Sequence, residues 1–222
     1  MITSARDAIL GKIRTSLRAS PDDRARLVAA ETRMMLHARG TVPARAAVQG
    51  GAAMVPFVAR LKAAAMTVSE AAHLSDVPKL AAEYLRVNNL PSRLRMGADP
   101  DLAALPWGTV PTLEIATGPA VGTDEVSLSK AFAGVAESGT LVLISGADNP
   151  TTLNFLPDTQ IVVMRAADVV GGYEDVWDRL RAAGSLPRTV NWISGPSRTA
   201  DIEQTLVLGA HGPRRLHVIL AG

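Results

Sequence analysis

The chain has 222 residues, 47% of them hydrophobic, so it is long and apolar enough to bury the core of one large domain, or of one domain with an appendage. It has no cysteine, which excludes disulfides and thiolate-held zinc or iron–sulfur clusters. No apolar run reaches the roughly 18 residues that span a bilayer, and no leader pattern opens the chain, so we expect a soluble, cytoplasmic protein without a membrane span.

Charge is distributed unevenly along the chain, although the net charge is only +2. Residues 1–65 carry 11 Lys and Arg against 4 Asp and Glu, and residues 66–222 carry 12 against 17. The basic residues are spread along expected helices without aromatic residues between them. This spacing favours a solvated helix face, or docking on an acidic surface, over nucleic-acid binding.

The N-terminal residues follow a helical period. Ile9, Ile13 and Leu17 form one apolar stripe behind a Ser4 cap, and residues 20–23 read as the start of a second helix that stops at Gly40. We therefore predict a helical arm over residues 1–45 and a separate domain over residues 46–222.

The domain begins with two further helices and two short strands. Apolar residues at helical spacing predict a helix over 52–66, and residues 75–78 open another that ends near 88–89. Short strands are expected at 93–96 and 112–115.

Strand patterns dominate the second half. Residues 135–137 and 140–144 flank Ser138-Gly139, which predicts a two-residue hairpin loop. Strands at 160–164, around 190 and at 217–220 alternate with a helix over 173–183. This alternation predicts an α/β fold, with helices covering a layered, largely parallel sheet and a local antiparallel hairpin.

The segment after the expected strand 189–193 is the best candidate for ligand binding. Ligands of open α/β sheets bind beyond the carboxyl ends of strands, and this loop offers the Ser197 hydroxyl, the Arg198 guanidinium and backbone donors beside Gly195 to an anion. A structural explanation is equally simple. Thr199 can cap a helix that has Asp201 and Glu203 in its first turn, although capping does not require an arginine at 198.

Standard catalytic signatures are absent from the sequence. It has no Gly-x-Gly-x-x-Gly, no phosphate-binding Gly-Lys-Ser/Thr loop and no His-Glu-x-x-His, and Thr199 replaces the second glycine of a nucleophile elbow, which makes Ser197 a poor nucleophile. The four histidines are scattered, so no metal site is expected. His217 fits a core strand, whereas His211 lies in a Gly-Pro loop that is more open to function.

Glu137 is the acidic residue with the strongest claim to a catalytic role. At the hairpin corner it either faces solvent without function or, held between two strands, faces a pocket. The sequence leaves both directions open.

Two stretches resemble the LUD-domain family of lactate-utilisation proteins. The first, residues 132–143, contains Ala136-Glu137-Ser138-Gly139-Thr140, and the second joins residues 194–203 to 208–213 and 216–218. The resemblance covers about residues 46–222. Members often carry an acidic residue and a Phe before the Ala-Ile-Ala-Glu run, where this chain reads Ala131-Phe132-Ala133-Gly134, so no role of that acidic position is transferred.

The resemblance implies a fold like ribose-5-phosphate isomerase and CoA-transferase-like proteins, whose relatives bind anionic substrates. It also implies a part in oxidising L-lactate to pyruvate beside two iron–sulfur partner proteins. A chain without cysteine fits that division, because any cluster then lies in another subunit.

Two functional classes follow. The first is a non-redox subunit of a lactate-oxidising assembly that binds a small anion (carboxylate or phosphate) or a partner; the second is a free-standing enzyme acting on a phosphate ester or CoA thioester, with Glu137 as nucleophile or base. Homo-oligomer formation stays open. The expected ligand-binding residues are Thr140, Gly195, Ser197, Arg198, Thr199, Asp201, Glu203 and His211, and we expect no metal or cofactor in this chain.

Overall fold

A computed structural model describes residues 4–18, 20, 23–199 and 207–222. The chain forms two compact units, residues 1–41 and residues 42–222. The first holds helices α1 (Ala5–Ser16) and α2 (Arg24–Leu36), both begun by caps: the Ser4 hydroxyl accepts the Asp7 N–H and the Asp23 carboxylate accepts the Arg26 N–H. Helix α2 ends four residues before the predicted Gly40, because His37 adopts a left-handed conformation (φ 46°).

Neither helix of the first unit buries a side chain among the described residues. The predicted apolar stripe is present but solvent-exposed, with Ile9 59%, Ile13 48% and Leu17 60% exposed. An amphipathic helix gains most of its stability from covering its apolar face, so this stripe is available for another surface.

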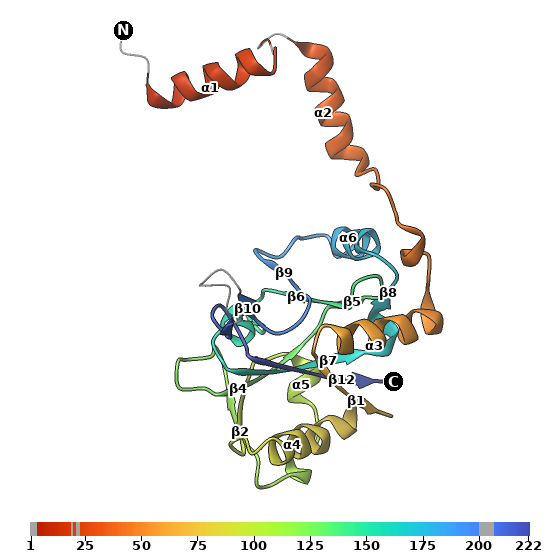
Figure 1. Ribbon diagram of the computed structural model, residues 1–222, viewed down its shortest axis with the longest axis vertical. Coiled ribbons are helices and arrows are strands. Elements are labelled where there is room, and N and C mark those ends of the chain that lie inside the picture. The colour runs from red at the N-terminus through yellow and green to blue at the C-terminus, as the bar shows by residue number, and fades with distance from the viewer. Residues whose placement is uncertain (1–3, 19, 21–22, 200–206) are drawn as a thin grey trace. The chain divides into compact units, whose positions relative to one another are not determined.

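The second unit is built on a six-stranded sheet in which every strand pair is parallel. The strand order is β1-β12-β7-β4-β2-β3 (Figure 1). In that order the strands are β1 (Thr67–Ala71), β12 (Arg215–Ala221), β7 (Thr159–Arg165), β4 (Val126–Lys130), β2 (Arg93–Met96) and β3 (Glu114–Thr117). The central strands β7 and β12 are apolar runs because both faces of the sheet are covered.

A second, four-stranded sheet has the order β8-β5-β6-β9. Its strands are β8 (Val169–Val170), β5 (Ala133–Val135), β6 (Thr140–Ile144) and β9 (Val190–Ile193). Strand β6 runs antiparallel to both β5 and β9, and β5 runs parallel to β8. A short ribbon pairs β10 (Arg198–Thr199) with β11 (Val207–Leu208).

Helices complete the layers shown in Figure 1. Helix α4 (Val77–Val87) and the short α5 (Pro100–Ala103) pack on one face of the six-stranded sheet, while α3 (Met54–Ala63) and the four-stranded sheet pack on the other. Helix α6 (Tyr173–Ala182) covers the outer face of the four-stranded sheet. The 3-10 helices are η1 (Ala44–Ala46), η2 (Gly50–Ala53), η3 (Leu74–Asp76), η4 (Trp107–Thr109), η5 (Thr151–Asn154) and η6 (Ala166–Asp168).

The layered α/β fold with a largely parallel sheet and an antiparallel hairpin is confirmed. The hairpin loop is longer than predicted, because Val135 pairs with Thr140 and leaves four residues, 136–139, between the strands. Ala136 and Glu137 donate their N–H groups to Val170 and Gly171, which lie on the other side of β5. Gly139 closes the loop at φ 68°, and a side chain there would strike Arg60 of α3.

Candidate functional site

Polar side chains gather at one end of the strands of the four-stranded sheet, which we call its polar edge. Strands β5, β8 and β9 end at this edge, and β6 begins there, since β6 runs against β5 and β9. The edge therefore brings together the loop after β5, the turn that starts α6, the first residue of β6 and the segment after β9. These four segments are up to about 60 residues apart in sequence, yet hydrogen bonds made by their side chains join them.

Thr140 is the centre of a hydroxyl cluster at this edge. Its side chain is fully buried, and its Oγ1 lies 2.7 Å from Ser138 Oγ, 2.9 Å from Tyr173 Oη and 2.6 Å from Ser194 Oγ. A hydroxyl has one proton to donate and two lone pairs, so three partners use the full capacity of Thr140. The cluster carries no formal charge and orients three further hydroxyls around one point.

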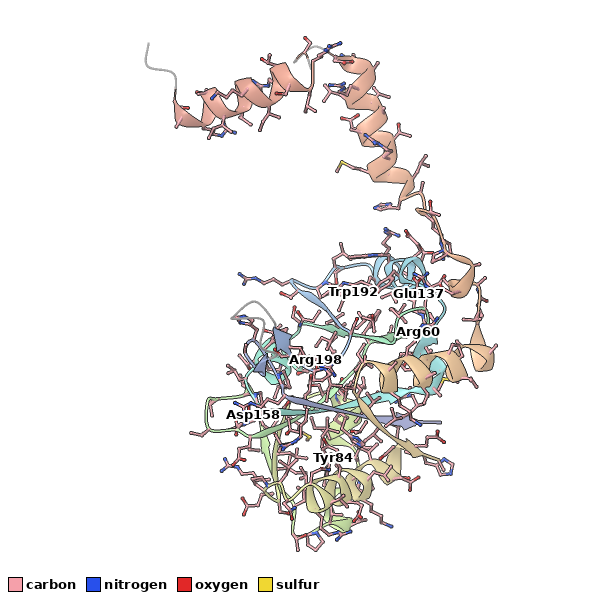
Figure 2. The ribbon with its side chains drawn as sticks, in the orientation of Figure 1. Arg60, Tyr84, Glu137, Asp158, Trp192 and Arg198 are labelled. Atoms are coloured by element: carbon pink, nitrogen blue, oxygen red, sulfur yellow. The ribbon has the colours of Figure 1, made fainter. Side chains whose placement is uncertain are left out.

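The Glu137 carboxylate is buried beside this cluster rather than exposed at a hairpin corner. Its side chain is 6% exposed, and its Oε1 accepts the Tyr173 N–H at 3.2 Å, at the first residue of α6. Arg45 Nε lies 3.6 Å from Oε2. Through these two contacts Glu137 connects the start of α6 with the segment before α3 (Figure 2).

A cavity of about 250 Å³ adjoins the hydroxyl cluster. Ser194 belongs to both, because it lines the cavity and hydrogen-bonds Thr140. The other lining residues come from the end of η5 and the residue after it, from β9, from the loops on either side of the β10–β11 ribbon, and from β12: Asn154, Phe155, Trp192, Ile193, Gly195, Ser197, His211, Gly212, Pro213 and Leu216. Three of the predicted ligand-binding residues, Gly195, Ser197 and His211, thus lie around one cavity.

The backbone of this loop is held by close contacts. Gly195 has φ 118°, and a side chain there would strike the carbonyl oxygen of Ala64. The His211 N–H donates to Ser197 Oγ at 3.2 Å, while the Ser197 N–H donates to the Pro213 carbonyl. Since Ser197 Oγ accepts from the backbone, its own O–H proton is available for a ligand.

The remaining predicted loop residues do not line this cavity in the part of the chain described. Arg198 has an exposed side chain and belongs to β10 (Figure 2), where it pairs with Leu208. Thr199 is the second residue of that strand. Asp201 and Glu203, and with them the helix expected after Thr199, lie outside the described residues.

Three aromatic rings pack against one another beside the hydroxyl cluster and the cavity. The Trp192 ring, which also lines the cavity, lies 5.2 Å from Tyr173 and 5.4 Å from Trp177 between ring centroids. These tilted contacts fix the Tyr173 ring and so fix its hydroxyl against Thr140. Tyr173 was missed by the sequence analysis, because only the pairing of β5 with β8 brings the start of α6 to the hairpin.

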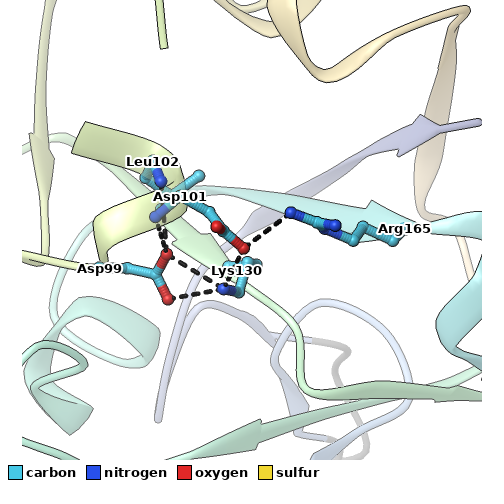
Figure 3. Close-up of polar contacts among 5 residues, drawn as sticks. All are labelled: Asp99, Asp101, Leu102, Lys130 and Arg165. Atoms are coloured by element: carbon cyan, nitrogen blue, oxygen red, sulfur yellow. Dashed lines mark hydrogen bonds and ion pairs between the residues drawn. The ribbon is translucent and has the colours of Figure 1, made fainter. Parts of the chain in front are cut away.

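A second polar cluster was also missed: four charged residues at the carboxyl ends of the large sheet (Figure 3). Lys130 Nζ, at the end of β4, lies 2.9 Å from Asp99 Oδ2 and 2.9 Å from Asp101 Oδ2. Arg165, at the end of β7, donates to the same Asp101 oxygen at 2.8 Å. Asp99 also caps α5 by accepting the N–H groups of Asp101 and Leu102. We call these four side chains the ion-pair cluster.

The pKa directions follow from those contacts. The Lys130 hydrogen bond, with Arg165 nearby, lowers the pKa of Asp101. Burial opposes the charge of Lys130, but hydrogen bonds to Asp101 and Asp99 outweigh it and raise its pKa. Asp101 and Lys130 are therefore both charged near neutral pH, and each favours the charged form of the other.

His217 lies away from both clusters, in the interior of the large sheet. It is 2% exposed, stacks on Tyr84 at 4.0 Å between ring centroids, and its Nδ1 lies 2.8 Å from Thr67 Oγ1. Nε2 is buried without a hydrogen-bond partner in the described structure, so the neutral ring carries its proton on Nδ1 and donates to Thr67. Burial lowers the pKa of His217 to about 4.

Two features are not found among the described residues. No group of three or more His, Asp or Glu side chains there could hold a metal ion. None of the described helices is both long and apolar enough to cross a membrane.

Comparison with known proteins places the chain among relatives named for lactate utilisation. It is 40% identical over 90 residues to lactate utilization protein C of Bacillus subtilis, covering 39% of this chain and 38% of that protein. It is 32% identical over 126 residues to lactate utilization protein C of Geobacillus kaustophilus, covering 51% of this chain and 52% of that protein. The matched stretch thus spans between about a third and half of the length of these relatives.

A crystal structure supports the fold. The DUF162 family protein from Deinococcus radiodurans superposes with a TM-score of 0.62 at 23% identity, over 79% of this chain and 99% of that one. The LUD domain model matches residues 56–221, which include the hairpin, the loop after β9 and the carboxyl-terminal strand. The chain belongs to the LUD-domain family.

Proposed function

We propose that this chain is the non-redox subunit of a cytoplasmic L-lactate-oxidising assembly and that the cavity at Ser194 binds a small carboxylate or phosphate. The names of the relatives support involvement in lactate utilisation. Iron–sulfur clusters are assigned to partner subunits, in keeping with the absence of cysteine here.

One observation carries the anion-binding part of the proposal: Ser194 joins the buried hydroxyl cluster to the cavity. Ser197 adds a hydroxyl to the same cavity, with no acceptor for its proton among the described residues, and His211 adds an imidazole ring. Neutral donors fixed by their neighbours can bind a carboxylate without the desolvation cost of burying a free cation. A volume of about 250 Å³ suits an anion of a few heavy atoms.

Calorimetric titration with L-lactate, pyruvate and phosphate tests anion binding. We expect Ser197→Ala to weaken binding by about tenfold, the worth of one hydrogen bond to a charged group. Ser185→Ala, an exposed serine after α6, is the matched control and leaves binding unchanged. Equal affinity in wild type and Ser197→Ala would refute the assignment.

Arg198→Ala is a second variant for the same titration. Arg198 follows Ser197 in the chain and its side chain is exposed, so its guanidinium can approach an anion in the cavity from the solvent side. Arg198→Ala then lowers affinity mainly at low ionic strength, because an exposed charge is screened by salt. No change at low salt would remove Arg198 from the binding site and leave the cavity assignment to Ser197.

The arm is the proposed docking element for a partner. The exposed stripe of Ile9, Ile13 and Leu17 supplies apolar contact, and the basic excess of residues 1–65 favours an acidic surface. Ile13→Glu in the full chain should weaken co-elution with the iron–sulfur proteins. Thr15→Glu, on the opposite side of α1, adds the same charge without touching the stripe; equal loss in both variants would refute docking through the stripe.

A further inference from the structure

The ion-pair cluster lies where the topology of the large sheet changes direction. Strand β2 leads through α5 to β3 at one edge, whereas β4 leads through the four-stranded sheet to β7 on its other side. The two connections also cover opposite faces, since Leu102 of α5 packs with α4 while Leu141 of β6 packs with α3. In open parallel sheets, the crevice beyond the carboxyl ends of two such neighbouring strands is where ligands bind.

All four charges stand at that point of the sheet. Asp99 follows β2 by three residues, Lys130 ends β4, and Arg165 ends β7, the next strand along. Asp101 reaches the same point from α5. Each residue has a local role, Asp99 as the cap of α5 and Lys130 and Arg165 as strand ends, but the strand order brings all four charges to one point.

The two carboxylates differ in how firmly they are held. The Asp99 side chain is 9% exposed and is fixed by two backbone N–H groups as well as by Lys130. The Asp101 side chain is 43% exposed, and a single oxygen, Oδ2, bridges Lys130 and Arg165. Asp101 can therefore rotate into solvent at small cost, while Asp99 stays in place.

We propose that the ion-pair cluster is a second carboxylate-binding site, in which Asp101 occupies the place of the ligand until a small monocarboxylate displaces it. Without Asp101, Lys130 and Arg165 carry two positive charges against the single negative charge of Asp99. The remaining charge of +1 matches a monocarboxylate. None of these four residues lines the cavity at Ser194, so this site is separate from that of the proposed function.

The geometry also selects the kind of carboxylate. A ligand oxygen in the place of Asp101 Oδ2 would receive hydrogen bonds from Lys130 Nζ and Arg165 Nη2. Asp99 Oδ2 lies 2.9 Å from the same Lys130 Nζ, so the Asp99 carboxylate is beside that ligand oxygen. Asp99 is an acceptor, so a hydroxyl on the neighbouring carbon can donate to it, and a keto group cannot. We therefore expect 2-hydroxy acids such as L-lactate to bind more tightly than pyruvate or acetate.

Asp101→Ala tests the site by removing the internal competitor. Calorimetric titration of the full chain with L-lactate at low ionic strength should show a site at least about tenfold tighter in Asp101→Ala than in wild type, the worth of one charge-assisted hydrogen bond. Adding Arg165→Gln to Asp101→Ala should abolish that gain. In the double variant Lys130 stays paired with Asp99, so neither remaining charge of the cluster is left alone, and melting curves check that both variants are folded.

Glu83→Gln is the matched control, because it removes a carboxylate from the Arg86 ion pair on an exposed face of α4. It frees a guanidinium without a neighbouring lysine and should gain no lactate binding. The proposal is overturned if Asp101→Ala binds lactate no better than wild type, if the double variant keeps the gain, or if Glu83→Gln gains as much. Binding that is lost only in Ser197→Ala would uphold the cavity at Ser194 and refute this site.

Discussion

The polar edges of the two sheets differ in charge and in exposure. At the edge of the four-stranded sheet, hydroxyls surround a fully buried Thr140, and the buried Glu137 carboxylate contacts Arg45 and the start of α6. At the edge of the six-stranded sheet, two cations and two carboxylates meet, and three of the four side chains are between 23% and 43% exposed.

This difference separates a rigid region from an adjustable one. The buried Thr140 hydroxyl uses all its hydrogen bonds, so moving any of its three partners would leave a buried polar group unsatisfied. Exposed ion pairs contribute little to stability, so one partner can leave without unfolding the chain. Three of the four predictions below concern residues at these edges, and one concerns His217 in the interior of the large sheet; they run from the largest expected effect to the smallest.

Two glycines, one beside each edge, should be the least replaceable of the residues named here. A Cβ on Gly171 would overlap the carbonyl oxygens of Ala46 and Val48, and one on Gly97 would overlap that of Asp148. A backbone carbonyl, unlike a flexible side chain, cannot change rotamer to avoid the new Cβ. Each Gly→Ala change should therefore destabilise the chain by about 3 kcal/mol or more. Thermal and denaturant unfolding measure this. Gly108→Ala has open space around it and is the control; equal losses in all three would contradict the packing.

Acid should affect the large sheet through His217. Its pKa falls from 6.5 in the unfolded chain to about 4 in the folded one because of burial, so the unfolded state binds more protons between these values. The stabilisation is present above pH 6.5 and is lost as the pH falls towards 4, by about 3 kcal/mol in all. The stability difference between wild type and His217→Gln should shrink by that amount from pH 7 to pH 4. A constant difference would show that His217 does not titrate in this way.

Thr140→Val should destabilise the small-sheet edge by about 2 kcal/mol, because it leaves Ser138, Tyr173 and Ser194 without their shared partner at nearly constant volume. Thr140→Ser keeps the hydroxyl and should recover most of the loss. Urea unfolding of both variants measures the effect. A Thr140→Val variant as stable as wild type would show that the Thr140 hydroxyl does not stabilise this edge.

Arg45→Ala should have the smallest effect, below about 1 kcal/mol, because Arg45 is 62% exposed and lies 3.6 Å from Glu137. Its loss leaves Glu137 with the Tyr173 N–H and the start of α6. Chemical unfolding of Arg45→Ala beside wild type measures this. A larger loss would show that the guanidinium, rather than the helix, holds the Glu137 carboxylate.

The fold could be predicted from the sequence where one period dominates. Strands β7 and β12 are nearly continuous apolar runs, and α4 opens at a Pro-containing turn, so each was expected within a few residues of its observed bounds. Strand β4 was missed because Ser127 and Ser129 interrupt its apolar pattern. Both serines are buried and hydrogen-bonded, Ser127 to the Leu153 carbonyl, and such partners cannot be read from local sequence.

The two polar clusters were unequally predictable. Gly195, Ser197 and His211 come from short segments that resemble one family pattern, and the structure brings them around one cavity. The ion-pair cluster joins residues that are up to 66 positions apart, and each has a local explanation: Asp99 as a helix cap, Lys130 and Arg165 as solvated strand ends. Only the order of the parallel strands brings them together.

Assembly with the iron–sulfur proteins is the most direct test of the central claim, that this chain works as a non-redox subunit. The full chain is mixed with the iron–sulfur lactate-utilisation proteins, and size-exclusion chromatography is combined with metal analysis of each fraction. The account predicts one stable complex that contains this chain, with all iron carried by the partners. Separate elution of the chain at its own mass, with lactate oxidation by the partners unchanged, would contradict it.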